Sequence, residues 1–193
     1  MTEVEETAQN RRRLLPRDRR RAQLLQAAAT AFARQGFAAT GLEDVAREAG
    51  VTRAIIYRHF ASKTELYQGV LDDTQERLRE RLGSPDQYDE QTVRALVDAA
   101  CDDPDGFRLL FRHAQHEPEF ATYTEERIRL AARITETYLT DVLPDEAHRR
   151  WVAGLIPKLA IELILSWLDA GRPTGRDDLV RMIRATSRTL AGR

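Results

Sequence analysis

The sequence predicts an all-α protein with two domains. Apolar residues recur three and four positions apart along most of the 193 residues, and no segment shows the apolar–polar alternation with a period of two that is typical of a strand. The second half is divided into five helical segments by four clusters rich in proline, glycine or acidic residues, at 103–105, 117–119, 143–145 and 171–175. We therefore expect a small N-terminal helical domain, residues 17–70, joined to a helical bundle, residues 71–193.

Charge is distributed unevenly between these two domains. Residues 11–70 hold 12 Lys and Arg against 5 Asp and Glu, whereas residues 71–193 hold 18 against 23, although the whole chain has a net charge of −1. A basic module joined to an acidic one is what a protein that neutralises phosphates with one domain only would show.

Residues 1–16 are predicted to form a disordered basic arm. They have no apolar period and include Arg11-Arg12-Arg13. Two interpretations remain open: the arginines reach into a DNA minor groove, or they form a solvated run of charge.

The first domain begins with two amphipathic helices. One is expected from about Asp18 to Gln35, where Gly36 ends it, and it serves as scaffold. The second is expected to stop at Gly50, a residue that readily adopts the left-handed conformation of a tight turn. The apolar stripes of these helices are Leu24, Leu25, Ala28 and Phe32 in the first and Leu42, Val45, Ala46 and Ala49 in the second.

The third helix has the pattern of a DNA recognition helix. Thr52 is placed to cap it, and Ile56 and Phe60, four residues apart, anchor one face on a small core. Arg53 and Arg58 then lie on outward faces, where a major groove could receive them. Together with the preceding helix this predicts a helix-turn-helix.

Several spaced motifs between Arg20 and Val70 resemble the DNA-binding domain of the TetR family. In order, they are Gly36-Phe37-Ala38-Ala39-Thr40, Val45-Ala46, Gly50-Val51-Thr52, Tyr57-Arg58-His59-Phe60 and Ser62-Lys63. The resemblance implies a homodimeric repressor that leaves a palindromic double-stranded DNA operator when a small molecule binds the C-terminal domain.

The motif match assigns DNA contacts to individual residues. Base edges are expected to meet Arg53, Ala54, Ile55 and Arg58, and phosphates to meet Thr40, Thr52, Tyr57, His59 and Lys63. Gly41 departs from the family, which usually has Thr or Ser as the cap of the second helix. The hydroxyl that would cap this helix or contact a phosphate is therefore expected from Thr40 alone. Ile55 either contacts a thymine methyl group or extends the small core. Lys63 lies in the first turn of a fourth helix that Ser62 caps.

The last two helices are the predicted homodimer interface. Their apolar surfaces are too wide for one partner helix, and a twofold axis would pair them into a four-helix interface. The residues assigned to dimerisation are Leu159, Leu163, Trp167, Val180 and Ile183.

The helices between about 105 and 135 are predicted to hold a small-molecule effector of unknown identity. Aromatic side chains with a few polar ones suit such a pocket, and the candidates are Phe107, Phe111, His113, Tyr123 and Arg127. The alternative is a regulator controlled by a protein partner, which predicts a filled domain without a cavity.

Other classes of protein find little support. The sequence lacks a glycine-rich phosphate loop, a nucleophile elbow and a zinc-protease motif, so we predict no enzyme, no cofactor and no metal, although Cys101 with His113 is the enzymatic alternative. His113, His116 and Glu117 are too few ligands for zinc. A lone cysteine and an acidic start favour a cytoplasmic protein. The apolar stretch 151–168 contains Pro, Lys and Glu, which predicts a buried helix and no membrane span.

Overall fold

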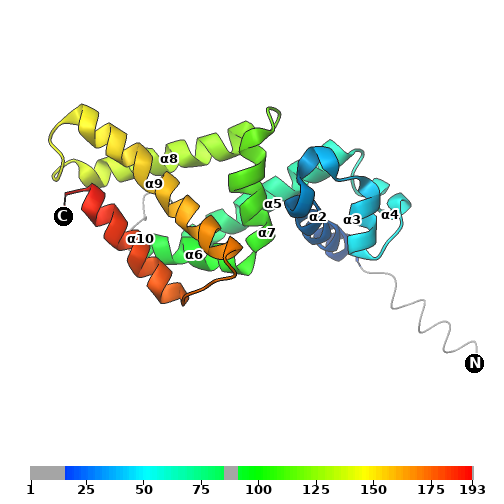
Figure 1. Cartoon of the computed structure of the whole chain (residues 1–193). Coiled ribbons are helices and arrows are strands. Elements are labelled where there is room, and N and C mark those ends of the chain that lie inside the picture. The colour runs from blue at the N-terminus through cyan, green and yellow to red at the C-terminus, as the bar shows by residue number, and fades with distance from the viewer. Residues whose placement is uncertain (1–15, 85–90, 193) are drawn as a thin grey trace, which may run out of the picture. The chain divides into compact units, whose positions relative to one another are not determined.

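The computed structural model of the chain describes residues 16–84 and 91–192, and all regular structure within them is helical (Figure 1). This confirms the prediction of an all-α fold. The chain divides into two compact units, Met1–Val70 and Leu71–Arg193. The predicted basic arm, apart from Pro16, lies outside the described residues.

The first unit contains α2 (Arg17–Ala39), α3 (Leu42–Ala49), α4 (Arg53–Tyr57) and the start of α5 (Lys63–Leu82). Gly36 has a φ of 78° and a ψ of 174°, so it breaks α2 where the sequence predicts a stop, and a last short turn follows it. Gly50 closes α3 with a φ of 64°, a left-handed conformation that L side chains disfavour. The turn of the helix-turn-helix therefore depends on this glycine.

A compact aromatic core holds the first unit together. The Tyr67 ring packs edge-on against Phe32, with ring centroids 4.9 Å apart, and lies 5.0 Å from Phe37. Ile56 and Phe60, the predicted anchors of the third helix, are 0% and 2% exposed. The Ser62 hydroxyl accepts a 3.0 Å hydrogen bond from the Glu65 N–H, so the predicted cap of the next helix is confirmed.

The second unit continues along α5 and adds α6 (Thr92–Asp102), α7 (Pro104–Arg108), a π-helical turn η2 (Leu109–His113), a 3₁₀ turn η3 (Ala114–His116), α8 (Ala121–Leu139), α9 (Glu146–Asp169) and α10 (Arg176–Leu190). The boundaries follow local caps. The Asp103 carboxylate accepts a hydrogen bond from the Gly106 N–H at 3.1 Å, and Asp145 accepts one from His148 N–H at 2.7 Å.

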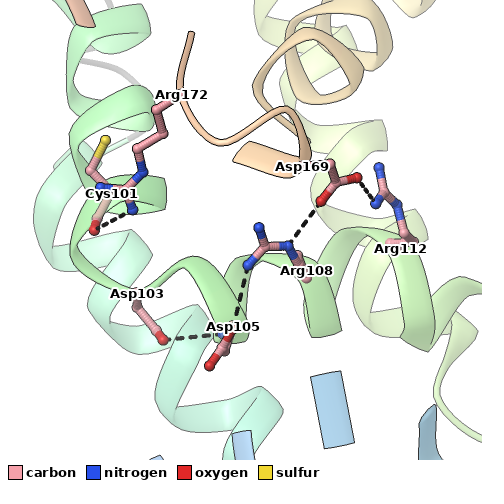
Figure 2. Close-up of polar contacts among 8 residues, drawn as sticks. Cys101, Asp103, Asp105, Arg108, Arg112, Asp169 and Arg172 are labelled. Carbon is pink, nitrogen blue, oxygen red and sulfur yellow. Dashed lines mark hydrogen bonds and ion pairs between the residues drawn. The ribbon is translucent and has the colours of Figure 1, made fainter. Parts of the chain in front are cut away.

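Helix α9 packs along α8, and α10 packs against both α9 and α6 (Figure 1). Charged pairs join the C-terminal end of α9 to the segment that follows α6. Figure 2 shows Asp169 between two guanidinium groups, accepting from Arg108 Nε at 3.1 Å and from Arg112. Burial alone would raise the pKa of Asp169, but its bonds to Arg112 and Arg108 lower it. Asp169 therefore stays ionised and keeps these elements together.

Within residues 16–84 and 91–192, α9 is the one helix long and apolar enough to span a membrane by composition. Half of its apolar window is buried inside the fold, as in the core helix of a bundle.

Candidate nucleic-acid interface and interior cavity

Helix α4 presents polar side chains on a surface supported by a buried residue. Thr52, Arg53, Tyr57 and Arg58 are exposed, with Tyr57 at 48%, while Ile56 between them is fully buried. Ile55 is half-buried and does not belong to the core residues, so it retains surface that a base could touch. A short helix anchored at one point and polar elsewhere can enter a major groove.

The Arg53 side chain is fixed by contacts with Tyr57 and Glu43 in the protein without DNA. Its Nη2 donates to the Tyr57 hydroxyl at 3.1 Å, its guanidinium lies 5.6 Å from the Tyr57 ring centroid, and Nη1 forms an ion pair with Glu43 of α3. The bond to Tyr57 and the charge of Glu43 raise the pKa of Arg53. Sequence reasoning missed Glu43, because only the folded turn brings α3 and α4 together.

Thr52 occupies the cap position of α4 but makes no side-chain capping hydrogen bond. This corrects the expectation that its hydroxyl caps the helix. Because Thr52 is exposed, the hydroxyl remains available to a phosphate.

Thr40 does not face solvent, which corrects its assignment as a phosphate contact. It is 2% exposed, and its hydroxyl donates to the Gly36 carbonyl at 2.7 Å. The cap of α3 comes instead from Asp44, whose carboxylate accepts the Gly41 N–H at 2.9 Å. That backbone bond, aided by Arg47, lowers the pKa of Asp44.

Lys63 is engaged by backbone carbonyls inside the first unit, and its expected contact with a phosphate stays a prediction. Its Nζ donates to the carbonyls of Phe37 at 2.8 Å and Thr40 at 3.2 Å, and it lies 4.3 Å from the Phe37 ring centroid. A cation at these carbonyls stabilises the C-terminal end of α2. Lys63 thus joins α2 to α5.

His59 follows α4 and is surrounded by positive charge. Burial is the main cause that lowers its pKa, and Arg17, Arg20, Arg21 and Arg58 lower it further. Three of these arginines come from α2, which the sequence interpretation treats as scaffold. At neutral pH the imidazole is uncharged and able to donate a hydrogen bond.

The second unit contains an apolar cavity of about 210 Å³ lined by α5, α6, η2, α8 and α9. Its walls include Leu82, Leu96, Ile128, Ile134, Ile156 and Ile161. The polar side chains among the lining residues are Thr92, Arg127, Thr135 and Tyr138.

Only two of the five predicted effector residues, Phe111 and Arg127, line this cavity. Phe107 lines a separate, more polar pocket of about 370 Å³. Tyr123 donates its hydroxyl to Asp72 at 3.0 Å, and burial, together with this bond, raises its pKa to about 12. Tyr123 and His113 are absent from the walls of both pockets. The assignments of Phe107, His113 and Tyr123 to the cavity are therefore corrected.

Three of the five predicted dimer residues lie in the core of one chain. Trp167, Val180 and Ile183 are 6%, 2% and 1% exposed, so they are core residues of one chain. Leu159 and Leu163 are half-buried. The large apolar side chains exposed on these two helices are instead Trp151 at 64% and Met182 at 49%.

A metal site would need several ligand side chains close together. In the part of the chain that the structure describes, no three His, Cys, Asp or Glu side chains are grouped to hold an ion. Cys101 is buried.

A helix-turn-helix with an exposed recognition helix, joined to a helical unit with an apolar cavity, defines a DNA-binding regulator. The family model for bacterial regulatory proteins of the tetR family matches residues 24–70. The transcriptional activator FasR of Mycolicibacterium smegmatis is 34% identical over 183 residues, covering 86% of this chain and 80% of FasR. The regulator TtgR of Pseudomonas putida is 46% identical over 72 residues, covering 36% of this chain and 34% of TtgR. This chain belongs to the TetR family of transcriptional regulators.

The fold extends over nearly the whole chain. A solved structure of a TetR-like regulator from Rhodococcus sp. RHA1 aligns with a TM-score of 0.78 at 20% identity, covering 93% of this chain and 100% of the other. The curated relatives are named as activators, repressors or regulators of transcription, which gives the enzymatic alternative no support.

Proposed function

We propose that this DNA-binding regulator is a homodimeric, cytoplasmic repressor that binds a palindromic operator and is released by a small apolar effector. In this proposal residues 17–70 bind DNA, and residues 71–193 dimerise and hold the effector. The main support is the geometry of α4, whose arginines and Tyr57 are exposed while Ile56 is fully buried.

We divide the proposed DNA contacts into side chains that meet base edges and side chains that meet phosphates. Arg53, Ala54, Ile55 and Arg58 meet base edges, and the arginines are suited to guanine O6 and N7. Thr52, Tyr57 and His59 meet phosphates, which fix the position of the protein without specifying sequence.

Two observations support dimerisation: the short length of α4, and the two large apolar side chains that are exposed on α9 and α10. A recognition helix of five residues contacts too few base pairs to define a site, whereas a twofold dimer reads two half-sites. Helices α9 and α10 pack against each other. The large apolar side chains exposed on them are Trp151 on α9 and Met182 on α10. We assign these residues, with half-buried Leu159 and Leu163, to the homodimer interface.

The effector is predominantly apolar and carries one anionic or hydrogen-bond-accepting group. The walls of the cavity are mainly aliphatic, and Arg127 is the one charged side chain among the described residues that line it. Arg127 Nη2 makes a long 3.5 Å contact with the Gln75 carbonyl, which an anionic group of the effector could replace. A cavity of this kind also favours a small molecule over control by a protein partner alone.

Selection from a randomised duplex pool at two salt concentrations tests the DNA-binding part. We expect wild-type protein to retain a palindrome, and Arg53→Ala and Arg58→Ala to relax single positions at a cost of about 1–3 kcal/mol each. Arg34→Ala is the matched control, because Arg34 is exposed on α2 and paired with Glu48. If the retained DNA shows no common motif and binding is lost at modest salt, the interaction is non-specific charge attraction and the proposal fails.

A reporter behind the selected operator tests the sign of regulation and the effector. Repression predicts that deletion of the regulator raises expression, whereas lower expression would indicate an activator, as FasR is named. Compounds that release the operator are then compared on Arg127→Leu and on Arg129→Leu, a control because Arg129 is exposed on the same helix and absent from the cavity walls. Loss of response in the first variant alone supports the assigned cavity.

A further inference from the structure

Three arginines in the first turns of α2 face the end of the recognition helix. Arg17, Arg20 and Arg21 all act on His59, as does Arg58. Positions 17, 20 and 21 lie on one face of a helix with 100° per residue, whereas Arg19 lies on the opposite face. The four guanidinium groups therefore lie close enough to the His59 imidazole to lower its pKa.

Within residues 16–84 and 91–192, three members of this group lack the carboxylate partners that other arginines of the same unit have. Arg34, Arg47 and Arg53 each pair with an acidic side chain. Over residues 16–84 and 91–192, Arg17, Arg21 and Arg58 form no ion pair, and all three are exposed. Like charges gathered without counter-charges repel one another, so an external anion would stabilise them.

Contacts with the turn hold the arginine side of α2 beside α4. The Arg21 guanidinium lies 5.0 Å from the ring centroid of Phe60, the buried residue that anchors the end of α4. Arg20 Nη1 donates to Gln23 Oε1 at 2.8 Å, and Gln23 Nε2 donates to the Ala49 carbonyl at the end of α3 at 3.0 Å. The arginines consequently keep a fixed position relative to the helix-turn-helix.

The matched family motif does not account for these side chains. The family model begins at residue 24, after all three arginines.

We infer that Arg17, Arg20 and Arg21, next to His59, form a second binding surface for the phosphate backbone of duplex DNA, beside Arg58 and the half-site that α4 reads. The inference rests on the proposed function, because it places this surface next to a helix in the major groove. Phosphates spaced along one strand supply the repeated negative charges that a row of guanidinium groups can neutralise. Helix α2 then contributes directly to affinity and is more than scaffold.

The salt dependence of DNA binding tests the surface. Affinities for the selected operator and for an unrelated duplex are measured by fluorescence anisotropy over a range of salt concentrations. In a variant with Arg17→Gln, Arg20→Gln and Arg21→Gln, we expect the slope of log K against log salt to become shallower by about 0.9 for each phosphate that the protein no longer neutralises. The change should be equal on both duplexes, so that the ratio of their affinities is preserved.

Two further variants keep the test independent of folding. Arg17→Gln alone removes an exposed side chain at the start of α2, and it should make the slope shallower by about 0.9. Arg19→Gln removes the same charge from the opposite face and should leave the slope near that of wild type. Thermal unfolding checks that each variant is folded.

Slopes for the triple and Arg17→Gln variants equal to that of Arg19→Gln would overturn the inference. If wild-type protein selects no palindrome but the slope still decreases in the triple variant, the proposed function fails and the backbone contact stands.

Discussion

The two units differ in where the residues assigned to binding lie: at the surface in the first unit and around a cavity in the second. In the first unit the residues assigned to DNA are outside, on α4, and the interior is filled by Phe32, Phe37 and Tyr67. In the second unit the assigned residues are inside, around a cavity of about 210 Å³. A helix that reads bases must hold its side chains rigidly, which a packed aromatic core provides. A sensor must leave space, and unfilled space forfeits packing energy that a ligand can restore.

The two units also differ in how some of their arginines are paired with carboxylates. In the second unit several bridge helices through carboxylates, as Arg94 does with Asp177, Arg176 with Asp98, and Arg77 with Asp103. In the first unit Arg17, Arg21 and Arg58 have no ion pair within the described residues. The first unit is therefore mixed: Arg53 is paired with Glu43 although it is assigned to bases, whereas Arg17, Arg21 and Arg58 are left available. The following changes test this division, beginning with the largest expected effect.

Removing the proposed dimer contact should abolish much of the DNA affinity without touching the first unit. Trp151→Glu combined with Met182→Glu replaces two exposed apolar side chains of the proposed interface with charges, so we expect monomers that bind the operator about 10²–10⁴-fold more weakly. Sedimentation velocity and anisotropy measure the two effects. Gln115→Glu with Thr122→Glu adds the same charge at exposed sites outside α9 and α10. If the variant is monomeric but its affinity for the operator is unchanged, operator binding does not require dimerisation and the prediction is wrong.

Two glycines of the second unit should respond in opposite directions to alanine. A Cβ on Gly106 would lie 2.1 Å from Asp103 Oδ2 and 2.5 Å from Thr74 Oγ1, so Gly106→Ala should lower the free energy of unfolding by about 1–3 kcal/mol. Gly154 lies inside α9 with nothing within 4 Å, and Gly154→Ala should raise it by about 0.5–1 kcal/mol. Urea unfolding measures both. Equal changes would show that α5 and α7 do not pack tightly at Gly106.

Lys63→Met separates an internal contact from a DNA contact. Because Nζ binds the carbonyls at the end of α2, the change should lower the free energy of unfolding by about 1–2 kcal/mol while the salt slope of DNA binding is kept. Methionine retains the apolar contact with Phe37. A slope shallower by about 0.9 would show that Lys63 binds a phosphate after all.

The smallest effect is expected from His59 and pH. Burial and the surrounding arginines hold its pKa below the ordinary value of 6.5, and a bound phosphate would raise it again. DNA binding then takes up a proton, so affinity should increase as pH falls from about 7.5 to 5.5, by less than about tenfold. His59→Gln should remove this dependence, and His148→Gln, on α9, should not. An unchanged pH profile in His59→Gln would exclude contact between His59 and phosphate.

Local chemistry explains what the sequence alone determined. Apolar periodicity, the Ser62 cap, and the glycines at 36 and 50 act within a few residues, and they predicted the helices and the helix-turn-helix that the structure contains. The same spacing placed Ile56 and Phe60 in the core.

Which side chains remain available was decided by tertiary structure, because burial depends on neighbours distant in sequence. Lys63 is engaged by a carbonyl 26 residues away, and Trp167, Val180 and Ile183 are covered within one chain although their helices are apolar enough for a partner. Phe111 and Arg127 line the cavity while Tyr123, four residues before Arg127 on α8, binds Asp72 of α5. Periodicity assigns a residue to a face of its helix, but only the packing of the other helices determines whether that face meets solvent, a cavity or the core.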